Sequence, residues 1–157
     1  MASGSVDLIG GYWQAPPTGG NSIDLDGLQP GAISQSFLDT DGQVYTVSFW
    51  LSGNPDGPPE TKTVDVSAGG TSETFTYTIG ANTEPAMNYV PESFTFTGTG
   101  SDTLTFTSGD PGTEPSGEIP AYGPVIGGVR IPDGGTTLVL LGLAVAGLAG
   151  LRRKLSA

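Results

Sequence analysis

The sequence predicts an all-β protein, an antiparallel two-sheet β-sandwich followed by one C-terminal hydrophobic transmembrane helix. Three observations support this fold class. Short segments alternate between apolar and polar residues, turn-forming residues separate these segments, and an uncharged apolar stretch lies near the C-terminus. The 157 residues are enough for one domain with a hydrophobic core. We therefore divide the chain into a sandwich domain at 1–131 and a tail at 132–157.

The clearest predicted strand covers residues 43–51. Its odd-numbered positions from Tyr45 to Leu51 are apolar, and threonine and serine recur between them. The same period of two marks eight further predicted strands, at 6–9, 22–25, 32–37, 62–68, 73–79, 92–98, 102–108 and 125–131. About nine short strands separated by turns are typical of an antiparallel sandwich.

Glycine and proline mark the predicted reversals. Gly69 and Gly70 lie between two strands and are expected to close a hairpin, because both can adopt positive φ angles. Residues 108–124 contain four prolines among glycines and acids, which predicts a long exposed loop before the last strand.

The tail has three parts. Pro132, Asp133, Gly134 and Gly135 break regular structure, and residues 136–151 follow without a charge. A helix of this length spans about 24 Å, which flanking residues can extend toward the ~30 Å of a bilayer core. A buried amphipathic helix is the alternative, but the stretch has no polar face. The spanning interpretation is therefore favoured.

A basic cluster ends the tail. Arg152, Arg153 and Lys154 directly follow the apolar stretch, and such clusters remain on the cytoplasmic side of a membrane. We therefore expect the body of the protein to lie outside the cytoplasm.

Composition excludes several functions. Residues 1–135 carry two bases and sixteen acids, a formal charge of −14, and such a body repels nucleic acid. The chain contains no cysteine and no histidine, which removes thiol nucleophiles, the usual zinc ligands and imidazole bases. We therefore predict that the protein is not an enzyme.

The tail resembles the PEP-CTERM class of bacterial sorting signals, in a variant whose motif reads Pro-Asp-Gly at 132–134. The resemblance implies that an exosortase, a membrane enzyme, processes the motif during export. It also implies a precursor in the inner membrane of a Gram-negative-type bacterium and a mature protein at the cell surface or in the extracellular matrix.

The body resembles the choice-of-anchor C proteins, which are related to the DUF642 group. The resemblance rests on DLIGGYWQ, SIDLDG, GAISQSF, YTVSFWLSGNPDG, VSAGGTSETF and VPESFTFTGTG. It implies a galactose-binding-like jelly roll without catalytic activity that binds polysaccharide. Residues 1–5 lack the apolar core of a signal peptide, so we expect the natural N-terminus and a first strand to lie upstream.

The first candidate binding residues are Tyr12, Trp13 and Gln14, which lie beside a loop rich in proline and glycine. An aromatic ring there can offer a flat face to a sugar, and Gln14 can bond its hydroxyls. Alternatively, Trp13 caps one end of the sandwich, which is the more common role of a large aromatic residue. Trp50 alternates opposite Phe49 and Leu51, so it either forms a platform for a ligand on the face of the sheet or covers a partly exposed sheet.

The second candidate residues are oxygen donors. Asn54 and Asp56 lie on a glycine-flanked loop, and Asp24 and Asp26 alternate along a predicted strand. Hard cations such as Ca²⁺ use such ligands, but the spacing matches no calcium motif. We favour turn residues that bond nearby amides, and predict no metal or other cofactor.

Together these observations predict an exported protein that an exosortase sorts and whose sandwich binds extracellular polysaccharide without catalysis. A purely structural envelope or biofilm protein is the first alternative. A glycan-active enzyme is a weaker one, because two suitably spaced carboxylates suffice for that chemistry. The scattered acids favour a solvated surface instead.

Overall fold

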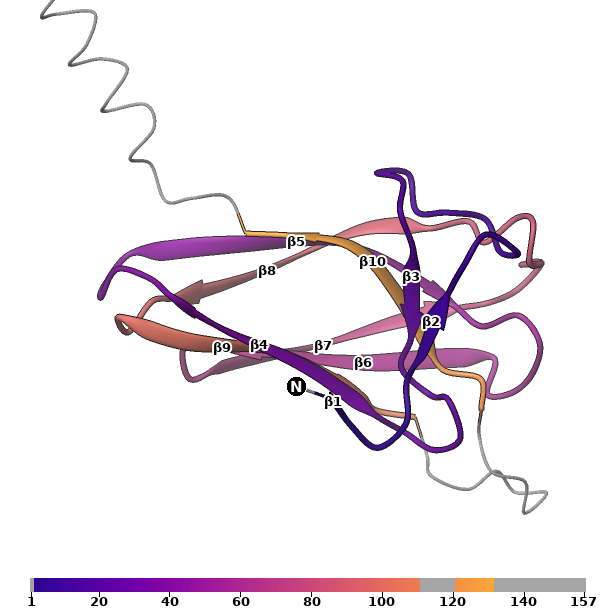
Figure 1. Ribbon diagram of the computed structural model, residues 1–157, viewed down its shortest axis with the longest axis horizontal. Helices are drawn as coiled ribbons and strands as arrows, with labels where there is room; N and C mark the ends of the chain where they lie inside the picture. The colour runs from indigo at the N-terminus through magenta and orange to yellow at the C-terminus, as the bar shows by residue number, and fades with distance from the viewer. Residues whose placement is uncertain (1, 111–120, 132–157) are drawn as a thin grey trace, which may run out of the picture.

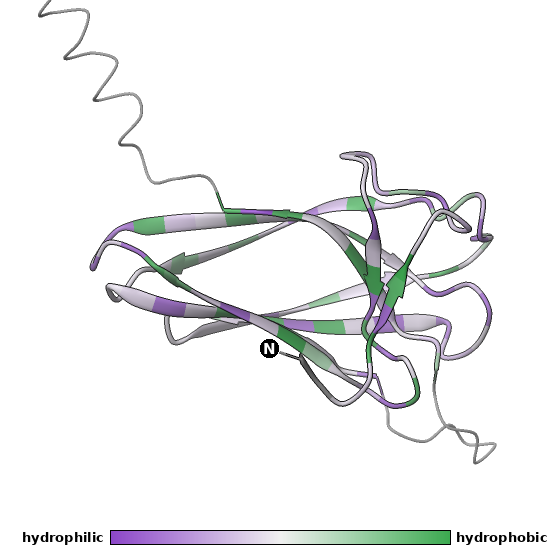
Figure 2. Ribbon diagram, in the orientation of Figure 1, coloured by the Kyte–Doolittle hydropathy of each residue, from purple (hydrophilic) through white to green (hydrophobic). Residues whose placement is uncertain are grey.

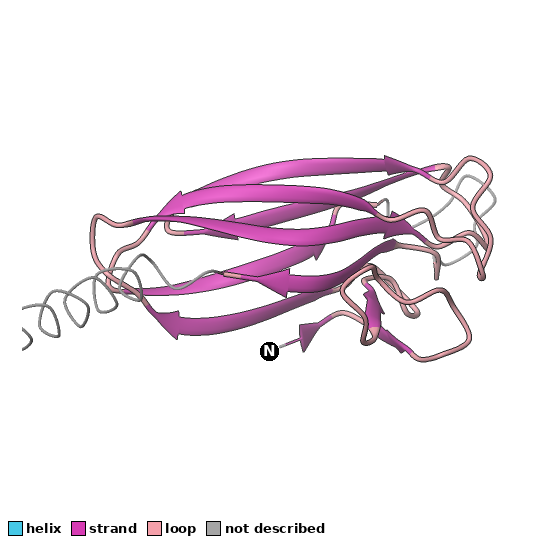
Figure 3. Ribbon diagram, turned by 90° about the horizontal axis from the view of Figure 1, so that it is seen from above, coloured by secondary structure: helices cyan, strands magenta, loops and turns pink. Residues whose placement is uncertain are grey.

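The computed structural model describes residues 2–110 and 121–131, which form a sandwich of two five-stranded antiparallel sheets (Figure 1). The first sheet has the order β1 (Ala2–Ser3), β4 (Ala32–Leu38), β9 (Ser101–Ser108), β6 (Thr61–Ala68) and β7 (Thr71–Thr78). The second has the order β2 (Asp7–Ile9), β3 (Ser22–Asp24), β10 (Pro124–Arg130), β5 (Val44–Gly53) and β8 (Val90–Thr97). Strands and loops account for all of the described chain (Figure 3).

The predicted all-β sandwich is confirmed, and each predicted strand coincides with one from β2 to β10. Only β1 was not predicted, because two residues are too short to show a period of two. The predicted helix at 136–151 lies outside the described residues. Within the described ranges, no helix is long and apolar enough to cross a membrane.

The core lies between the two sheets and follows from the alternation of side chains. Apolar bands alternate with polar ones along the strands in Figure 2. In β5, the side chains from Tyr45 to Leu51 on the inner face are buried. Phe49 packs edge-to-face against Phe75 and Phe106 of the opposite sheet, with ring centroids 5.2 Å apart in both pairs. These contacts join the sheets directly.

The β6–β7 hairpin closes at Gly69 and Gly70, whose φ angles are 55° and 72°. Ala68 pairs with Thr71, so the loop contains these two residues alone. Two consecutive positive φ angles match the right-handed twist of the flanking strands. The predicted hairpin is confirmed.

Several loops gather at one end of the sandwich, at the right of Figure 1. This loop end consists of residues 10–21, 54–60, 79–89 and 121–123. A small second core beneath it contains Ile9, Trp13, Met87 and Val125.

Candidate functional site at the loop end

Trp13 belongs to the second core of the loop end. Its side chain is 5% exposed and packs with Ile9, Met87 and Val125. The ring therefore caps one end of the sandwich, as the second interpretation of the sequence predicted. Its faces are not available to a sugar.

Tyr12, the neighbouring residue, has the opposite environment. Its side chain is 62% exposed, and its ring meets Trp13 edge-to-face with centroids 5.7 Å apart. The buried indole therefore supports an exposed phenol ring from below.

Gln14, which follows Tyr12 and Trp13, forms hydrogen bonds with the loop at 79–89. Its side-chain oxygen accepts a hydrogen bond from the Met87 N–H at 2.7 Å, and its own backbone N–H donates to the Glu84 carbonyl at 2.7 Å. Gln14 was predicted to bond a ligand, but the acceptor of its side chain already serves the fold.

Asn54 is buried and connects two segments that lie 30 residues apart in sequence. Its amide nitrogen donates to Asp24 Oδ2 at 2.6 Å, and its Oδ1 accepts from the Asp56 N–H at 2.9 Å. Asp24 Oδ1 accepts from the N–H groups of Asp26 and Gly123, at 2.9 and 3.0 Å. Asp24 and Asn54 therefore bond nearby backbone amides, as the sequence predicted for them as turn residues.

Burial is the largest cause of the pKa shifts of Asp24 and Asp26. It raises the pKa of Asp24 from 3.8 to about 7, although the bonds from Asp26, Asn54 and Gly123 oppose the shift. Burial also raises the pKa of Asp26, although the Ser108 hydroxyl, the Lys62 charge and the Gly31 N–H each lower it. No hydrogen bond of ordinary geometry reaches either carboxylate oxygen of Asp26 within the described part of the chain.

Lys62 supplies the positive charge of the cluster and is fully buried. Its ammonium donates to the carbonyl oxygens of Gly57, at 2.8 Å, and Tyr122. Sequence analysis missed this residue, although the alternation of β6 places Lys62 on the same inward face as Val64 and Val66. We call Asp24, Asp26, Asn54 and Lys62 the polar cluster.

Metal ligation finds no support at the polar cluster. No group of three or more acidic residues, histidines or cysteines within 2–110 and 121–131 is arranged to hold a metal ion. The oxygens of Asp24 and Asn54 instead meet amide donors.

Four residues on the loops of the loop end have exposed side chains, and we call them the rim. It consists of Tyr12, Asp56, Glu84 and Asn88. Partial burial and the charge of Glu84 raise the pKa of Asp56. The rim thus offers one aromatic face and carboxylate acceptors, which are groups that recognise sugars. The Asn88 amide nitrogen already donates to Asn82 Oδ1 at 3.0 Å and to the Ala86 carbonyl at 3.2 Å.

Trp50 is half-buried on the outer face of β5. A Cβ at Gly128 would meet the Trp50 ring at 3.0 Å and also the Thr18 side chain, and one at Gly127 would meet Pro16. The loop at 10–21 therefore folds over this part of the sheet. Trp50 covers the sheet rather than forming an open platform.

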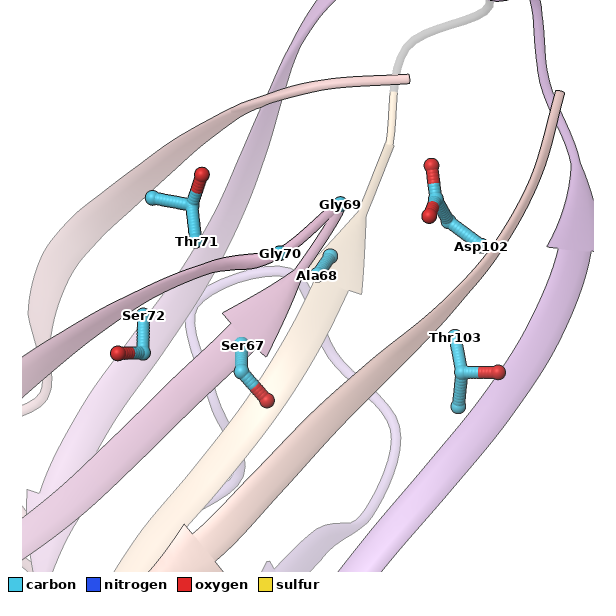
Figure 4. A pocket seen from close by; sticks show the side chains of 8 residues that line it. All are labelled: Ser67, Ala68, Gly69, Gly70, Thr71, Ser72, Asp102 and Thr103. Atoms are coloured by element: carbon cyan, nitrogen blue, oxygen red, sulfur yellow. The ribbon is translucent and has the colours of Figure 1, made fainter. Parts of the chain in front are cut away.

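A shallow pocket of about 380 Å³ lies at the β6–β7 hairpin, far along β6 from the polar cluster (Figure 4). Hydroxyl groups and Asp102 line it. Asp102 is occupied by the N–H and the hydroxyl of Thr99, at 2.8 and 2.9 Å. The pocket has no aromatic ring among its lining residues, so it lacks the apolar face that a sugar ring stacks on.

The residues of the predicted sorting tail, Pro132 to Gly135 and Arg152 to Lys154, lie outside the described residues. Family comparison nevertheless identifies this segment. Residues 131–155 match the VPDSG-CTERM motif, and residues 1–132 match the family described as "Protein of unknown function (DUF642)". Both resemblances predicted from the sequence are confirmed.

Solved structures with a similar fold include carbohydrate-binding modules. A family 35 module from an environmental isolate has a TM-score of 0.55 at 17% identity, with 86% of each chain covered. A family 35 module from Clostridium thermocellum has a TM-score of 0.54 at 12% identity, with 85% of this chain and 91% of that chain covered. These likenesses establish the jelly-roll fold.

One curated relative is halomucin of Haloquadratum walsbyi. It is 40% identical over 55 residues, which amount to 34% of this chain. The aligned region is 1% of halomucin, so the chain spans a very small part of that protein.

Proposed function

Because the chain belongs to the DUF642 family and ends in a VPDSG-CTERM motif, we propose that it is an exported protein whose non-catalytic sandwich binds polysaccharide. The rim of the loop end is the proposed binding surface. The charge of −14 over residues 1–135 favours a neutral glycan over an acidic one, since like charges repel.

The observation that carries this proposal is the exposed Tyr12 ring held against Trp13. Sugar rings present C–H groups on their faces, which pack against aromatic rings. Asp56, Glu84 and Asn88 are exposed around the same loops and can bond sugar hydroxyls. A ring fixed by a buried neighbour loses little conformational freedom on binding, which favours affinity.

The buried acids support binding without catalysis. Asp24 has the strongly raised pKa that a general acid needs, but it is 1% exposed and three donors occupy its oxygens. A substrate cannot reach it without opening the loop end.

The tail directs the protein in this proposal. An exosortase acts on Pro132, Asp133, Gly134 and Gly135 while the apolar segment at 136–151 spans the inner membrane. Arg152, Arg153 and Lys154 hold the end of that segment on the cytoplasmic side. The mature protein then remains at the cell surface or in the extracellular matrix of a Gram-negative-type bacterium.

Glycan binding is tested with Tyr12→Ala and Tyr12→Phe on a glycan array, followed by affinity electrophoresis with the polysaccharides that bind. Tyr12→Ala should weaken retention about tenfold, since an aromatic contact contributes on the order of 1 kcal/mol or more. Tyr12→Phe should retain most of the affinity because it keeps the ring face.

Leu28→Ala is the matched control, because Leu28 is 75% exposed and lies outside the rim. Equal losses in Leu28→Ala and Tyr12→Ala would contradict a site at the rim. A protein that retains no glycan at all would support the structural alternative.

Sorting is tested by expressing the chain behind an export signal in a host with the matching exosortase. Mass spectrometry of the surface protein should show loss of the apolar segment, and deletion of the exosortase should leave the full-length precursor in membranes. An intact C-terminus on surface protein would refute processing. This result is independent of glycan binding.

A further inference from the structure

Two exposed carboxylates of the rim lie near its aromatic ring. Glu84 is next to the segment that carries Tyr12, because its carbonyl accepts a hydrogen bond from the Gln14 N–H at 2.7 Å. Asp56 is close enough to Glu84 for the Glu84 charge to contribute, after partial burial, to the raised pKa of Asp56. The side chains of Tyr12, Asp56 and Glu84 are all exposed. An aromatic face and two acids are thus available together at the loop end.

No basic side chain within the described ranges is placed to neutralise these acids. Lys62 and Arg130 are the two basic residues in that part of the chain. Lys62 is fully buried, and its ammonium donates to the carbonyl oxygens of Gly57 and Tyr122. Arg130 ends β10, whereas Pro124 at the start of that strand adjoins the loop end. The acids of the rim can therefore pair with a cation that a ligand supplies.

The charge of the whole body has the same sign as the rim. Residues 1–135 carry a formal charge of −14, which attracts cations and raises their concentration near the surface. A cation bound between Asp56 and Glu84 would offset the effect of the Glu84 charge on Asp56. Charge therefore favours a cationic ligand, while the exposed Tyr12 ring favours one with a flat apolar face.

We propose that the rim binds a polysaccharide of amino sugars whose amines are free rather than acetylated. This inference rests on the proposed function and names the class of glycan that the same site takes. The face of the sugar ring packs on Tyr12, and its ammonium group donates to the carboxylates of Asp56 and Glu84. An ammonium near the Tyr12 ring also gains a cation–π attraction. An N-acetylated sugar keeps the ring face but lacks the charge, so it binds more weakly.

A basic peptide is the other cationic ligand that such a surface can attract. Lysine side chains bring the same ammonium group, but on a flexible stem without a rigid ring face. Binding of a peptide would therefore depend on the acids and little on Tyr12. The dependence on Tyr12 separates the two kinds of ligand.

Isothermal titration calorimetry of the full-length protein in a neutral detergent tests the proposal with two probes. These are a chitosan oligosaccharide and the chitin oligosaccharide of the same length, which differ in N-acetylation. At about pH 6, amines are protonated and carboxylates of ordinary pKa are ionised. Chitosan should bind about tenfold more tightly than chitin. Its affinity should fall between about 0.01 and 1 M salt, because the Debye length shortens from about 30 to about 3 Å.

The double variant Asp56→Asn with Glu84→Gln removes both charges and nearly preserves side-chain shape. It should weaken chitosan binding about tenfold and change chitin binding by less than about twofold, since it removes ion pairs alone. Asp41→Asn with Glu73→Gln is the matched control, because it removes the same charge from exposed residues. Asp41 precedes β5, whereas Asp56 follows it, and Glu73 lies on β7. The control should weaken chitosan binding by less than about twofold.

Equal losses of chitosan affinity in the two double variants would overturn the inference, because the general charge of the body would then explain the binding. Chitin that binds as tightly as chitosan, and less tightly in Tyr12→Ala, would also overturn it but would leave the proposed function intact. Chitosan binding that Tyr12→Ala does not weaken would contradict the rim as a sugar site, and the proposed function with it.

Titration with oligolysine provides the peptide comparison. Oligolysine should bind more weakly than chitosan, and Tyr12→Ala should change its affinity by less than about twofold. Oligolysine that binds as tightly as chitosan, with the same losses in Tyr12→Ala and in the double variant of the rim, would overturn an amino sugar as the preferred ligand.

Discussion

The polar cluster and the rim of the loop end both contain aspartate and asparagine but differ in what their side chains contact. Asp24, Asn54 and Lys62 are buried, and their polar atoms meet backbone and side-chain partners from distant parts of the chain. Asp56 and Tyr12 lie on two loops of the same end of the sandwich and are exposed. Burial therefore separates the residues that hold the loops together from those that can contact a ligand.

This difference has a consequence for experiments on the site. Substitutions in the polar cluster should lower the unfolding free energy strongly, whereas substitutions on the rim should change binding and alter the unfolding free energy by no more than about 0.5 kcal/mol.

The largest effect is expected for Lys62→Met, which keeps the apolar stem and removes the ammonium. The change leaves Asp26 without its nearby positive charge and removes the donor to the Gly57 and Tyr122 carbonyls. Breaking a buried charge pair costs about 3–5 kcal/mol. Urea unfolding followed by circular dichroism should show a loss of unfolding free energy of about this size.

A double mutant separates the charge effect from packing. If the Asp26 carboxylate causes most of the loss, Asp26→Asn should add less in the Lys62→Met background than it does alone. Additive losses would mean that the two charges do not interact.

The next effect compares adjacent aromatic residues. Trp13→Ala should lower the unfolding free energy by about 3 kcal/mol, because a buried indole is lost from the second core. Tyr12→Ala should change it by no more than about 0.5 kcal/mol, because the ring is mostly exposed. Thermal unfolding of both variants measures the difference. Similar losses would show that Tyr12 also belongs to the core.

Local patterns predicted the strands but not the polar cluster, for a physical reason. The alternation from Tyr45 to Leu51 reports which side of a strand is buried, and the structure confirms it. The cluster depends on contacts across the chain, such as Asn54 with Asp24 and Gly123 with Asp24, 30 and 99 residues apart. No local period encodes such contacts.

Lys62 and Trp13 differ in how far the alternation of side chains predicts their burial. Lys62 occupies an inward position of β6, which already indicates a buried charge in need of partners. Trp13 gave no such signal, because it lies in a loop where side chains follow no period. Its packing with Met87 and Val125 agrees with the capping role that the sequence analysis favoured, because large aromatic residues are usually buried.

A third effect appears as a pH dependence. Asp24 has a pKa of about 7 in the folded protein against 3.8 in the unfolded chain, so the native state binds more protons between these values. Rising pH therefore favours unfolding, by up to about 1.4 kcal/mol per pH unit near pH 5.5. Asp24→Asn should remove this slope, measured by urea unfolding between pH 4 and 7. An unchanged slope would mean that Asp24 is ionised in the native state.

The smallest effect is expected for Asp56→Asn. It replaces a carboxylate of the rim by an amide, as Asp24→Asn does in the polar cluster. Partial burial and Glu84 raise the pKa of Asp56, so its ionised form slightly disfavours folding above its unfolded pKa. Removing the carboxylate should stabilise the protein at pH 7, by no more than about 0.5 kcal/mol because the side chain is exposed. The gain should be largely lost at pH 3, below the unfolded pKa of Asp56. Urea unfolding at the two pH values, with Asp24→Asn measured alongside, makes the comparison direct. A loss of more than about 1 kcal/mol in Asp56→Asn would place Asp56 in the polar cluster, and the rim would then consist of Tyr12, Glu84 and Asn88.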